Sequence, residues 1–263
     1  MIRSFNTAAT GMAAQEFLVD NTANNLANLN TTGFKRNQVA FQDLIYLNLL
    51  QPGTQLFQGT PVPTGLQIGS GVRVAGNSKV FVEGTLNNSG NPLDLAIEGD
   101  GFFQVTVTDG TTRYTRDGSF RLNANNQLVT SDGFLLTPNI TIPPNAQSIA
   151  IGTDGTVTVV TADNPTTSTS VGQINLARFP NPAGLSAEGR NLFNQTAASG
   201  NPTVGQPGQS GIGIIQEGFL EGSNVNVVQE LVNLILAQRG YEFNTRTVRV
   251  SDEMSQATTD LVR

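Results

Sequence analysis

The 263-residue chain contains no cysteine, no histidine and no tryptophan. Without cysteine it can form neither disulfides nor thiolate metal or redox sites. Without histidine it lacks the commonest general base and the commonest metal ligand. No apolar run approaches the roughly 20 residues that a membrane-spanning helix needs. The sequence therefore predicts no cofactor, no metal and no membrane-spanning segment.

Charge is also scarce, at 13% of residues, with a formal net charge of −6. No basic cluster is larger than the pair Lys35-Arg36. This composition argues against a nucleic-acid partner. The N-terminus, Met1 to Asn6, has no basic segment followed by an apolar run, so we expect no cleavable signal peptide.

The chain is instead rich in turn formers, with 28 glycines and 12 prolines. From Leu66 to about Phe219 the apolar residues alternate with polar ones, the period of β-strands. The expected short strands are Val72–Val74, Leu93–Ile97, Phe102–Val107, Ser119–Leu122, Ile149–Ile151, Thr156–Val160 and Gly172–Phe179. The segment Asn181–Gly211, rich in glycine, proline, serine and asparagine, is expected to be a long surface loop.

Asp-Gly pairs punctuate this region at positions 100–101, 109–110, 117–118, 132–133 and 154–155. Asp-Gly is typical of tight hairpin turns. It also occurs in calcium loops, but none of these sites carries a D-x-D-x-D-G run or a glutamate closing a twelve-residue loop. We interpret all five as hairpin turns.

Between Phe5 and Leu26 apolar or small residues recur at alternating steps of three and four, which predicts an amphipathic helix. Gly33 follows, placed for a left-handed turn that ends the element. Residues 36–65 are mixed. Phe41–Leu50 is compatible with a short helix or a strand, and Thr60–Gly65 is expected to be an extended loop.

The last 39 residues, Val225–Arg263, contain no proline and predict one long helix. Nine of the thirteen residues from Val225 to Ala237 are apolar, too many for a lone surface helix. Two apolar seams with a period near 3.5 residues run along it, the spacing of helices that supercoil. One comprises Val227, Leu231, Leu234, Tyr241 and Val248, and the other Leu236, Gly240, Phe243, Thr247, Val250, Met254, Ala257 and Leu261.

The N-terminal helix offers only one matching seam, so one apolar face of the C-terminal helix lacks a partner within the chain. We expect a second copy of the chain to cover it. The alternative is a helical hairpin that caps a β domain, with the domain covering the surplus face.

Three separated motifs closely resemble those of flagellar rod and hook proteins. The first is Ala23–Lys35, read as ANNLANLNTTGFK, and the last combines Ser223–Val227, Glu230–Val232 and Ala237–Glu242. Between them, Ile97–Phe103 and Tyr114–Phe120 resemble the β-domain core of the same family. The likeness covers the whole chain. Within the family, Asp43–Gly53 followed by Gly65–Gly69 is most similar to the distal rod proteins.

The resemblance implies an α+β fold with a coiled-coil-like helical inner domain and an all-β outer domain. The helical domain would comprise residues 1–35 and 224–263, a stiffening segment residues 36–70, and the β domain residues 71–223. It also implies a non-enzymatic subunit that polymerises into the distal rod, in the periplasm, and transmits motor torque. Implied partners are copies of itself, proximal rod and hook proteins, ring proteins and the flagellar type III export apparatus.

Two sets of residues follow from these patterns and the resemblance. The expected polymer interface comprises Phe5, Met12, Val19, Ala23, Asn24, Asn25, Leu26, Asn28, Gly33, Phe34, Val227, Leu231, Leu234, Gln238, Arg239, Gly240, Tyr241 and Val248. The expected stiffening segment includes Asp43, Leu44, Tyr46, Pro52 and Gly53.

Asparagine is a mediocre helix former, so the amides of Asn24, Asn25 and Asn28 need partners. Our hypothesis is that they bond across subunits and set the register, with a frayed helix end as the alternative. Family members usually carry alanine where this chain has Gly240. That glycine either permits closer helix approach or reflects neutral drift.

Within the family, a proximal rod or hook-type axial protein is the alternative. Two other classes of protein remain open: a secreted β-rich adhesin or binding module, and a periplasmic hydrolase that uses Asp94, Glu98 and Asp100. A glycosidase needs two carboxylates about 5–10 Å apart in a cleft. The chain has no tryptophan and three tyrosines to stack on a sugar, so structural or solvated carboxylates are favoured.

Overall fold

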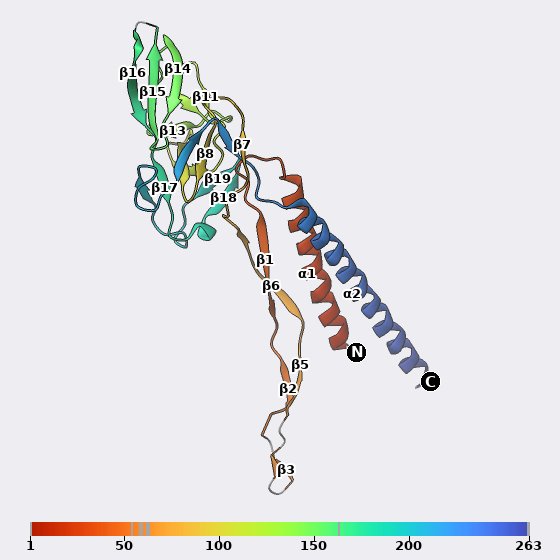
Figure 1. The fold of residues 1–263 in the computed structure, drawn as a ribbon. Helices are drawn as coiled ribbons and strands as arrows, with labels where there is room; N and C mark the ends of the chain where they lie inside the picture. The colour runs from red at the N-terminus through yellow and green to blue at the C-terminus, as the bar shows by residue number, and fades with distance from the viewer. Residues whose placement is uncertain (1, 54, 58–59, 62–63, 163, 262–263) are drawn as a thin grey trace. The chain divides into compact units, whose positions relative to one another are not determined.

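The computed structural model describes residues 2–53, 55–57, 60–61, 64–162 and 164–261 (Figure 1). Within these ranges a helix lies at each end of the chain and β-strands fill the middle, so the fold is α+β. The helices are α1 (Ile2–Ala27) and α2 (Val227–Leu261), and a short 3-10 turn, η1, spans Pro182–Gly184.

The chain forms two compact units. Unit 1 comprises residues 1–26, 37–78 and 226–263, and unit 2 comprises residues 27–36 and 79–225. This division differs from the three parts expected from the sequence in two places. The last residue of α1 and the segment after it, Ala27–Arg36, belong to the β-rich unit 2, and residues 37–78 group with the helices.

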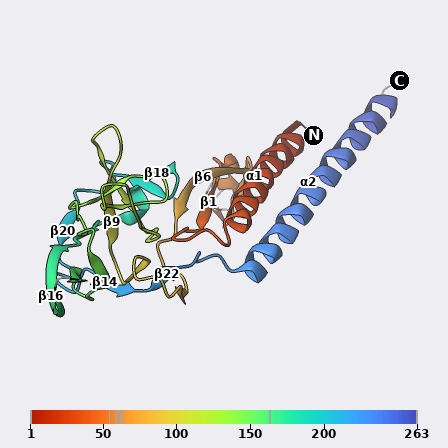
Figure 2. The same cartoon turned by 90° about the horizontal axis from the view of Figure 1, so that it is seen from above.

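In unit 1 the two helices run antiparallel, and both views show them alongside each other (Figures 1 and 2). Ser4 lies 3.3 Å from Ser251 between hydroxyl oxygens, and Asn25 reaches Glu230 near the start of α2. The Asn226 side chain accepts a hydrogen bond from the backbone of Gln229 and so caps α2. Both helices match their predicted spans to within a few residues.

Residues 37–78 of unit 1 form an arm of nested strand pairs. Its strands are β1 (Asn37–Asp43), β2 (Leu47–Leu50), β3 (Gln55–Phe57), β4 (Thr60–Pro61), β5 (Leu66–Ile68) and β6 (Val72–Lys79). The pairs are β1 with β6, β2 with β5, and β3 with β4. For Phe41–Leu50 the sequence allowed a short helix or a strand. The structure has strand there, in the end of β1 and in β2. The loop expected at Thr60–Gly65 begins in β4, and residues 62–63 lie outside the described residues.

Unit 2 is built around a nine-stranded sheet whose main path runs β11-β12-β13-β9-β10-β19-β18. Off this path, β17 pairs with β9, and β20 pairs with β17. A three-stranded sheet, β14-β15-β16, and the pairs β21-β8 and β22-β7 complete it. The strands are β7 (Leu86–Asn88), β8 (Leu95–Glu98), β9 (Phe102–Thr106), β10 (Thr112–Thr115), β11 (Arg121–Leu122), β12 (Leu128–Val129), β13 (Leu135–Thr137), β14 (Ala146–Ile151), β15 (Thr156–Thr161), β16 (Asn164–Gln173), β17 (Leu176–Arg178), β18 (Ser186–Gly189), β19 (Leu192–Asn194), β20 (Thr203–Gly205), β21 (Ile214–Glu217) and β22 (Phe219–Glu221).

The core of unit 2 lies between these sheets. Its largest cluster includes Phe103, Phe120, Leu136, Val157 and Ile215, all almost completely buried. Burial of such side chains contributes about 1.5–3 kcal/mol each relative to exposure. Unit 2 therefore has a continuous hydrophobic core of its own.

The predicted strands are all present, although the segment expected at Gly172–Phe179 is divided between β16 and β17, and only Arg121–Leu122 of Ser119–Leu122 is a strand. Three of the five Asp-Gly pairs, at 109–110, 132–133 and 154–155, connect strands that pair with each other. The other two hairpin predictions were wrong. The strand before Asp100 pairs with β21, and the strand before Asp117 pairs with β9 and β19.

The prediction of a surface loop at Asn181–Gly211 was also wrong. This segment contains η1, β18, β19 and β20, and its residues Leu192, Phe193 and Ser199 are buried. Strands of three or four residues carry too little periodicity to stand out among so many turn formers. Phe193 packs edge-to-face on Phe102, a long-range contact that the local sequence does not encode.

Candidate functional site

Most large apolar side chains of α2 are exposed rather than buried against α1, whereas Val227, Leu234 and Val248 are half-buried. The exposed ones comprise Val228, Leu231, Val232, Ile235, Leu236, Tyr241, Phe243, Val250 and Met254. Leu236 and Phe243 retain 63% and 62% of their accessible surface. An apolar stripe of this extent is unusual on the surface of a monomer and typical of a protein–protein interface.

The face of α2 that lies against α1 consists mainly of small and polar residues. Ala237 and Glu230 are its buried members, and Asn244 lies opposite Gly11 of α1. A Cβ atom at Gly11 would stand 2.8 Å from the Asn244 amide nitrogen, and one at Gly240 would stand 3.0 Å from Gln15 Cδ. At both positions a side chain of the facing helix packs directly over the glycine.

The predicted interface residues fall into three groups by exposure. The exposed ones are Phe5, Ala23, Asn24, Leu231, Gln238, Arg239 and Tyr241. The half-buried ones are Met12, Val19, Leu26, Asn28, Val227, Leu234, Gly240 and Val248. The buried ones are Asn25, Gly33 and Phe34. Val19, Gln238 and Tyr241 together line an open groove of about 460 Å³ between α1 and α2.

Asn25 is buried because both atoms of its amide bond within unit 1. Its Nδ2 donates to the Asn37 carbonyl at 2.9 Å, and its Oδ1 accepts from the Asn37 backbone N–H at 2.8 Å. Nδ2 also lies 3.4 Å from Glu230 Oε2. Asn21 donates to the same Asn37 carbonyl at 3.0 Å. The amide of Asn25 thus joins the end of α1 to the start of the arm and to α2.

Gly33 and Phe34 are interior residues of unit 2. Gly33 has φ +66°, and a Cβ atom there would stand 2.7 Å from the backbone of Arg116. Its N–H donates to the Glu221 carbonyl at 2.8 Å. We therefore leave Asn25, Gly33 and Phe34 out of the polymer-interface proposal, because each is enclosed by its own chain.

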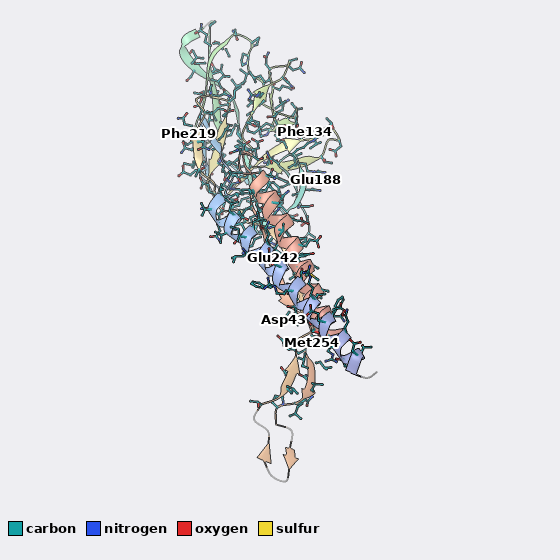
Figure 3. All side chains as sticks on the ribbon, turned by 90° about the vertical axis from the view of Figure 1, so that its right-hand side faces the viewer. Asp43, Phe134, Glu188, Phe219, Glu242 and Met254 are labelled. Carbon is teal, nitrogen blue, oxygen red and sulfur yellow. The ribbon has the colours of Figure 1, made fainter. Side chains whose placement is uncertain are left out.

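The predicted stiffening residues lie on the arm. Asp43 ends β1, Leu44 donates its N–H to the Gly71 carbonyl, and Tyr46 precedes β2 beside Gly69. Pro52 and Gly53 form the turn after β2. Figure 3 labels Asp43 on this ribbon. The arm also exposes Phe41, Ile45, Tyr46, Leu47, Leu49, Leu66 and Ile68.

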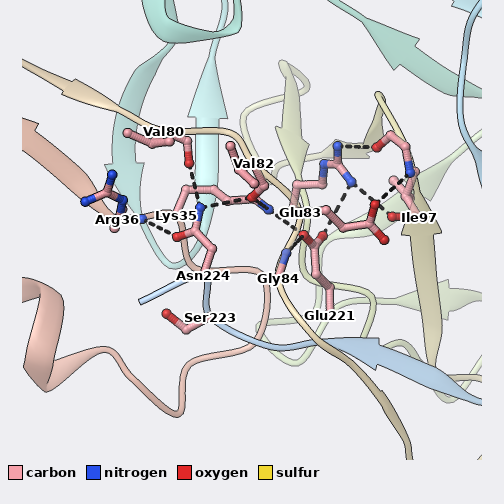
Figure 4. Close-up of polar contacts among 12 residues, drawn as sticks. Lys35, Arg36, Val80, Val82, Glu83, Gly84, Ile97, Glu221, Ser223 and Asn224 are labelled. Atoms are coloured by element: carbon pink, nitrogen blue, oxygen red, sulfur yellow. Dashed lines mark hydrogen bonds and ion pairs between the residues drawn. The ribbon is translucent and has the colours of Figure 1, made fainter. Parts of the chain in front are cut away.

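Unit 2 contains a buried charge cluster that sequence reasoning did not find (Figure 4). The Lys35 ammonium is completely buried and pairs with one carboxylate oxygen of Glu221, while Arg116 Nη1 lies 3.4 Å from the other. Lys35 also donates to the Val82 carbonyl at 2.8 Å, and Arg116 Nη2 to the Gly99 carbonyl at 2.6 Å. Buried charges need such pairing because an isolated ion inside a protein is very costly.

Burial lowers the pKa of Lys35 below its ordinary value, and the attraction of Glu221 opposes that change. Burial lowers the pKa of Arg116 in the same way, again against Glu221. One carboxylate therefore stabilises two desolvated cations. No pattern within a single sequence links Lys35 to Glu221, because 186 positions separate them.

Beside this cluster, Asn224 joins three segments of unit 2. Its Oδ1 accepts from the Arg36 N–H at 2.8 Å, and its Nδ2 donates to the carbonyls of Val80 and Val82 at 2.8 and 2.9 Å. The Val80 N–H in turn donates to the Arg36 carbonyl at 2.9 Å. A single side chain thus makes three hydrogen bonds to two distant segments.

The acidic residues considered for a hydrolase each have a structural partner. Asp94 accepts from Asn91 at 3.0 Å, Glu98 from Gln216 at 2.9 Å, and Asp100 lies 3.6 Å from Arg178. Across the described residues, no group of three or more acidic side chains has the arrangement of a metal site.

Neither described helix combines the length and hydropathy needed to cross a membrane.

Comparison with known protein families identifies three matching regions. Residues 5–35 match the flagella basal body rod protein family, and residues 96–159 match the flagellar hook protein FlgE/F/G D1 domain. Residues 216–261 match the flagellar basal body rod FlgEFG protein C-terminal family. The three matches coincide with the three regions that carried the sequence resemblance.

Curated relatives align over the whole chain. The flagellar basal-body rod protein FlgG of Buchnera aphidicola from Schizaphis graminum is 46% identical over 99% of this chain and 100% of its own length. FlgG of Borreliella burgdorferi is 44% identical, and FlgG of Bacillus subtilis 37% identical, each over 100% of both chains. The chain belongs to the family of flagellar basal-body rod proteins.

Proposed function

We propose that this chain is a structural subunit of the distal rod, which polymerises and transmits motor torque to the hook. The observation that carries the proposal is the exposed apolar stripe of α2, whose side chains lack a cover within the chain. Full-length similarity to basal-body rod proteins indicates which polymer would cover it. Proximal rod and hook proteins at its two ends, surrounding ring proteins and the export apparatus are the remaining partners of the proposal.

In this proposal the terminal helices form the inner tube of the polymer through coiled-coil-like packing. The interface comprises the exposed apolar stripe of α2, which includes Leu236 and Phe243, together with the exposed and half-buried residues predicted above. Asn24 and Asn28 would set the register between subunits. The arm would stiffen the polymer, and unit 2 would form its outer domain. The small, polar face that α2 turns toward α1 supports this, because it leaves the large apolar side chains for other subunits.

The proposal can be tested by the polymerisation of purified full-length chain, followed by electron microscopy. Leu236→Gln and Phe243→Gln change exposed residues. Glutamine is a good helix former, so neither substitution should disturb α2 itself. Both are expected to abolish filaments while leaving the midpoints of both urea transitions of the monomer unchanged. Val204→Gln, at an exposed apolar residue of unit 2, is the matched control and should polymerise normally.

Filaments formed by Leu236→Gln and Phe243→Gln as readily as by the unmodified chain would contradict the proposal. Limited proteolysis gives a second measure. Both helical ends should be trimmed in the monomer and protected in filaments, because assembly covers their apolar faces. Ends that are equally resistant in both states would also count against it.

A further inference from the structure

The chain passes between its two units four times, after residues 26, 36, 78 and 225. Three of these crossings, after residues 36, 78 and 225, lie next to three short segments of unit 2: 33–36, 79–84 and 221–224. We call these the junction segments. A force that one unit exerts on the other through these three crossings enters unit 2 along the junction segments. A force through the crossing after residue 26 reaches the first segment by way of residues 27–32.

The three junction segments are bonded to one another. The Val80 N–H donates to the Arg36 carbonyl, the Lys79 ammonium to the Lys35 carbonyl at 3.3 Å, and the Gly33 N–H to the Glu221 carbonyl. Asn224 then bonds to both of the other segments with one amide. Every pair of junction segments is therefore connected directly.

The buried charges reinforce these bonds. Glu221 of one segment accepts from Lys35 of another and from the Gly84 N–H of the third, at 3.0 Å for the latter. Lys35 also donates to Val82 in that third segment. Figure 4 shows these contacts gathered in one place. Pulling away the segment that carries Glu221 would leave Lys35 and Arg116 without their carboxylate partner in the interior, which is strongly unfavourable.

We propose that the three junction segments form a mechanical clamp, with Asn224 and the Lys35–Glu221 pair as its positioning residues. Bonds that connect all segments share the load, so no single connection is peeled from unit 2 before the others. The role of the clamp in carrying torque rests on the proposed rod function. The clamp itself is a property of the chain and can be tested on the monomer.

The test is single-molecule pulling of the full-length monomer. Because the chain has no cysteine, two introduced cysteines are unique attachment points. In the crossing geometry they replace Val204 in unit 2 and Val228 at the start of α2, both exposed. In the internal geometry they replace Val204 and Leu122, both in unit 2.

Asn224→Ala removes three hydrogen bonds and should raise the opening rate in the crossing geometry on the order of 100-fold at low force. In the internal geometry the rupture force should change little. Asn181→Ala is the matched control, since it removes an amide bond to the Ala198 carbonyl that lies wholly within unit 2 and outside the junction segments. It should leave the crossing geometry unchanged.

A general loss of stability would lower the rupture force of Asn224→Ala equally in both geometries, and that result would overturn the clamp. So would an unchanged rupture force in the crossing geometry. Lys35→Met provides a second variant, in which Glu221 keeps Arg116 as a partner, and it should also weaken the crossing geometry selectively. Neither outcome depends on filament formation, so failure of the clamp and failure of the rod proposal are distinguishable.

Discussion

Glu221 accepts hydrogen bonds from two buried cations, and the three side chains are almost completely shielded from water. The arrangement is asymmetric. Removal of Lys35 leaves Glu221 paired with Arg116, whereas removal of the Glu221 charge leaves Lys35 and Arg116 facing each other in the interior. The free energy of the cluster is therefore most sensitive at its single acidic member.

We predict that Glu221→Gln lowers the free energy of unfolding of unit 2 by about 3–5 kcal/mol, the cost of breaking a buried ion pair from one side. Lys35→Met should cost less, because a carboxylate and one cation remain paired. Urea unfolding of both variants, followed by near-ultraviolet circular dichroism, measures the difference. Equal losses would show that the charge balance of the cluster does not govern its energetics.

The pKa of Lys35 predicts a dependence of stability on pH. Burial lowers this pKa in the folded chain below 10.5, so between the two values the unfolded chain binds more protons. As pH rises through this range, the free energy of unfolding therefore increases. At pH values below the folded-state pKa, Lys35 stays charged in the folded chain and the full cost of burying its charge remains. We expect the stability of the unmodified chain relative to Lys35→Met to be greater at pH 10.5 than at neutral pH. If the unmodified chain does not gain stability relative to Lys35→Met between neutral pH and pH 10.5, the pKa of Lys35 is not lowered by burial.

At the scale of the element, α2 separates two roles on two faces. Its face toward α1 is small or polar, with Ala237 and Glu230 buried, and its outer face presents leucine, isoleucine, phenylalanine and methionine. A helix of 35 residues with this distribution has more apolar surface than one antiparallel neighbour covers. Its stability in the monomer is accordingly expected to be modest.

Gly240→Ala should increase helicity of α2 and stabilise it by up to about 1 kcal/mol. The new Cβ would meet Gln15, whose half-buried flexible side chain can move aside. Gly33→Ala is the contrasting change, because its Cβ would meet the Arg116 backbone at a positive φ, and unit 2 should lose stability. Far-ultraviolet circular dichroism during thermal unfolding measures both. Loss of helicity in Gly240→Ala would mean that close approach at this position outweighs helix propensity.

At the scale of the whole molecule, the two units differ in how they are stabilised. Unit 2 has an extensive apolar core, whereas the buried residues of α1 and α2 are few and mostly small or polar: Ala8, Ala14, Asn21, Thr22, Asn25, Glu230 and Ala237. Cooperative unfolding of the whole chain as one unit is not expected from such a distribution.

We predict two transitions when the full-length monomer is titrated with urea. The helical signal in far-ultraviolet circular dichroism should be lost first. The near-ultraviolet signal of the aromatic residues in unit 2 should follow. In filaments the first transition should move to higher urea, because assembly covers the apolar face of α2. A single coincident transition in the monomer would show that the units are more strongly coupled than their separate cores imply.

Local patterns in the sequence were sufficient for both helices, for seven of the sixteen strands described in unit 2 and for the three hairpins at Asp109, Asp132 and Asp154. These features depend on residues that are neighbours in the chain, where periodicity and turn chemistry act directly. The three family motifs were likewise visible in the sequence, and they coincide with the regions that match known rod protein families.

Only the tertiary structure decided which faces and charges meet. It enclosed Asn25, Gly33 and Phe34, placed strands within Asn181–Gly211, and brought Lys35 to Glu221 and Arg36 to Asn224 across more than 180 positions. Such pairings depend on the packing of distant segments, which no local period encodes. The sequence by itself determined an α+β chain with a surplus of apolar helix surface. The fold decided that this surplus lies outward on α2, because small and polar residues occupy the face toward α1.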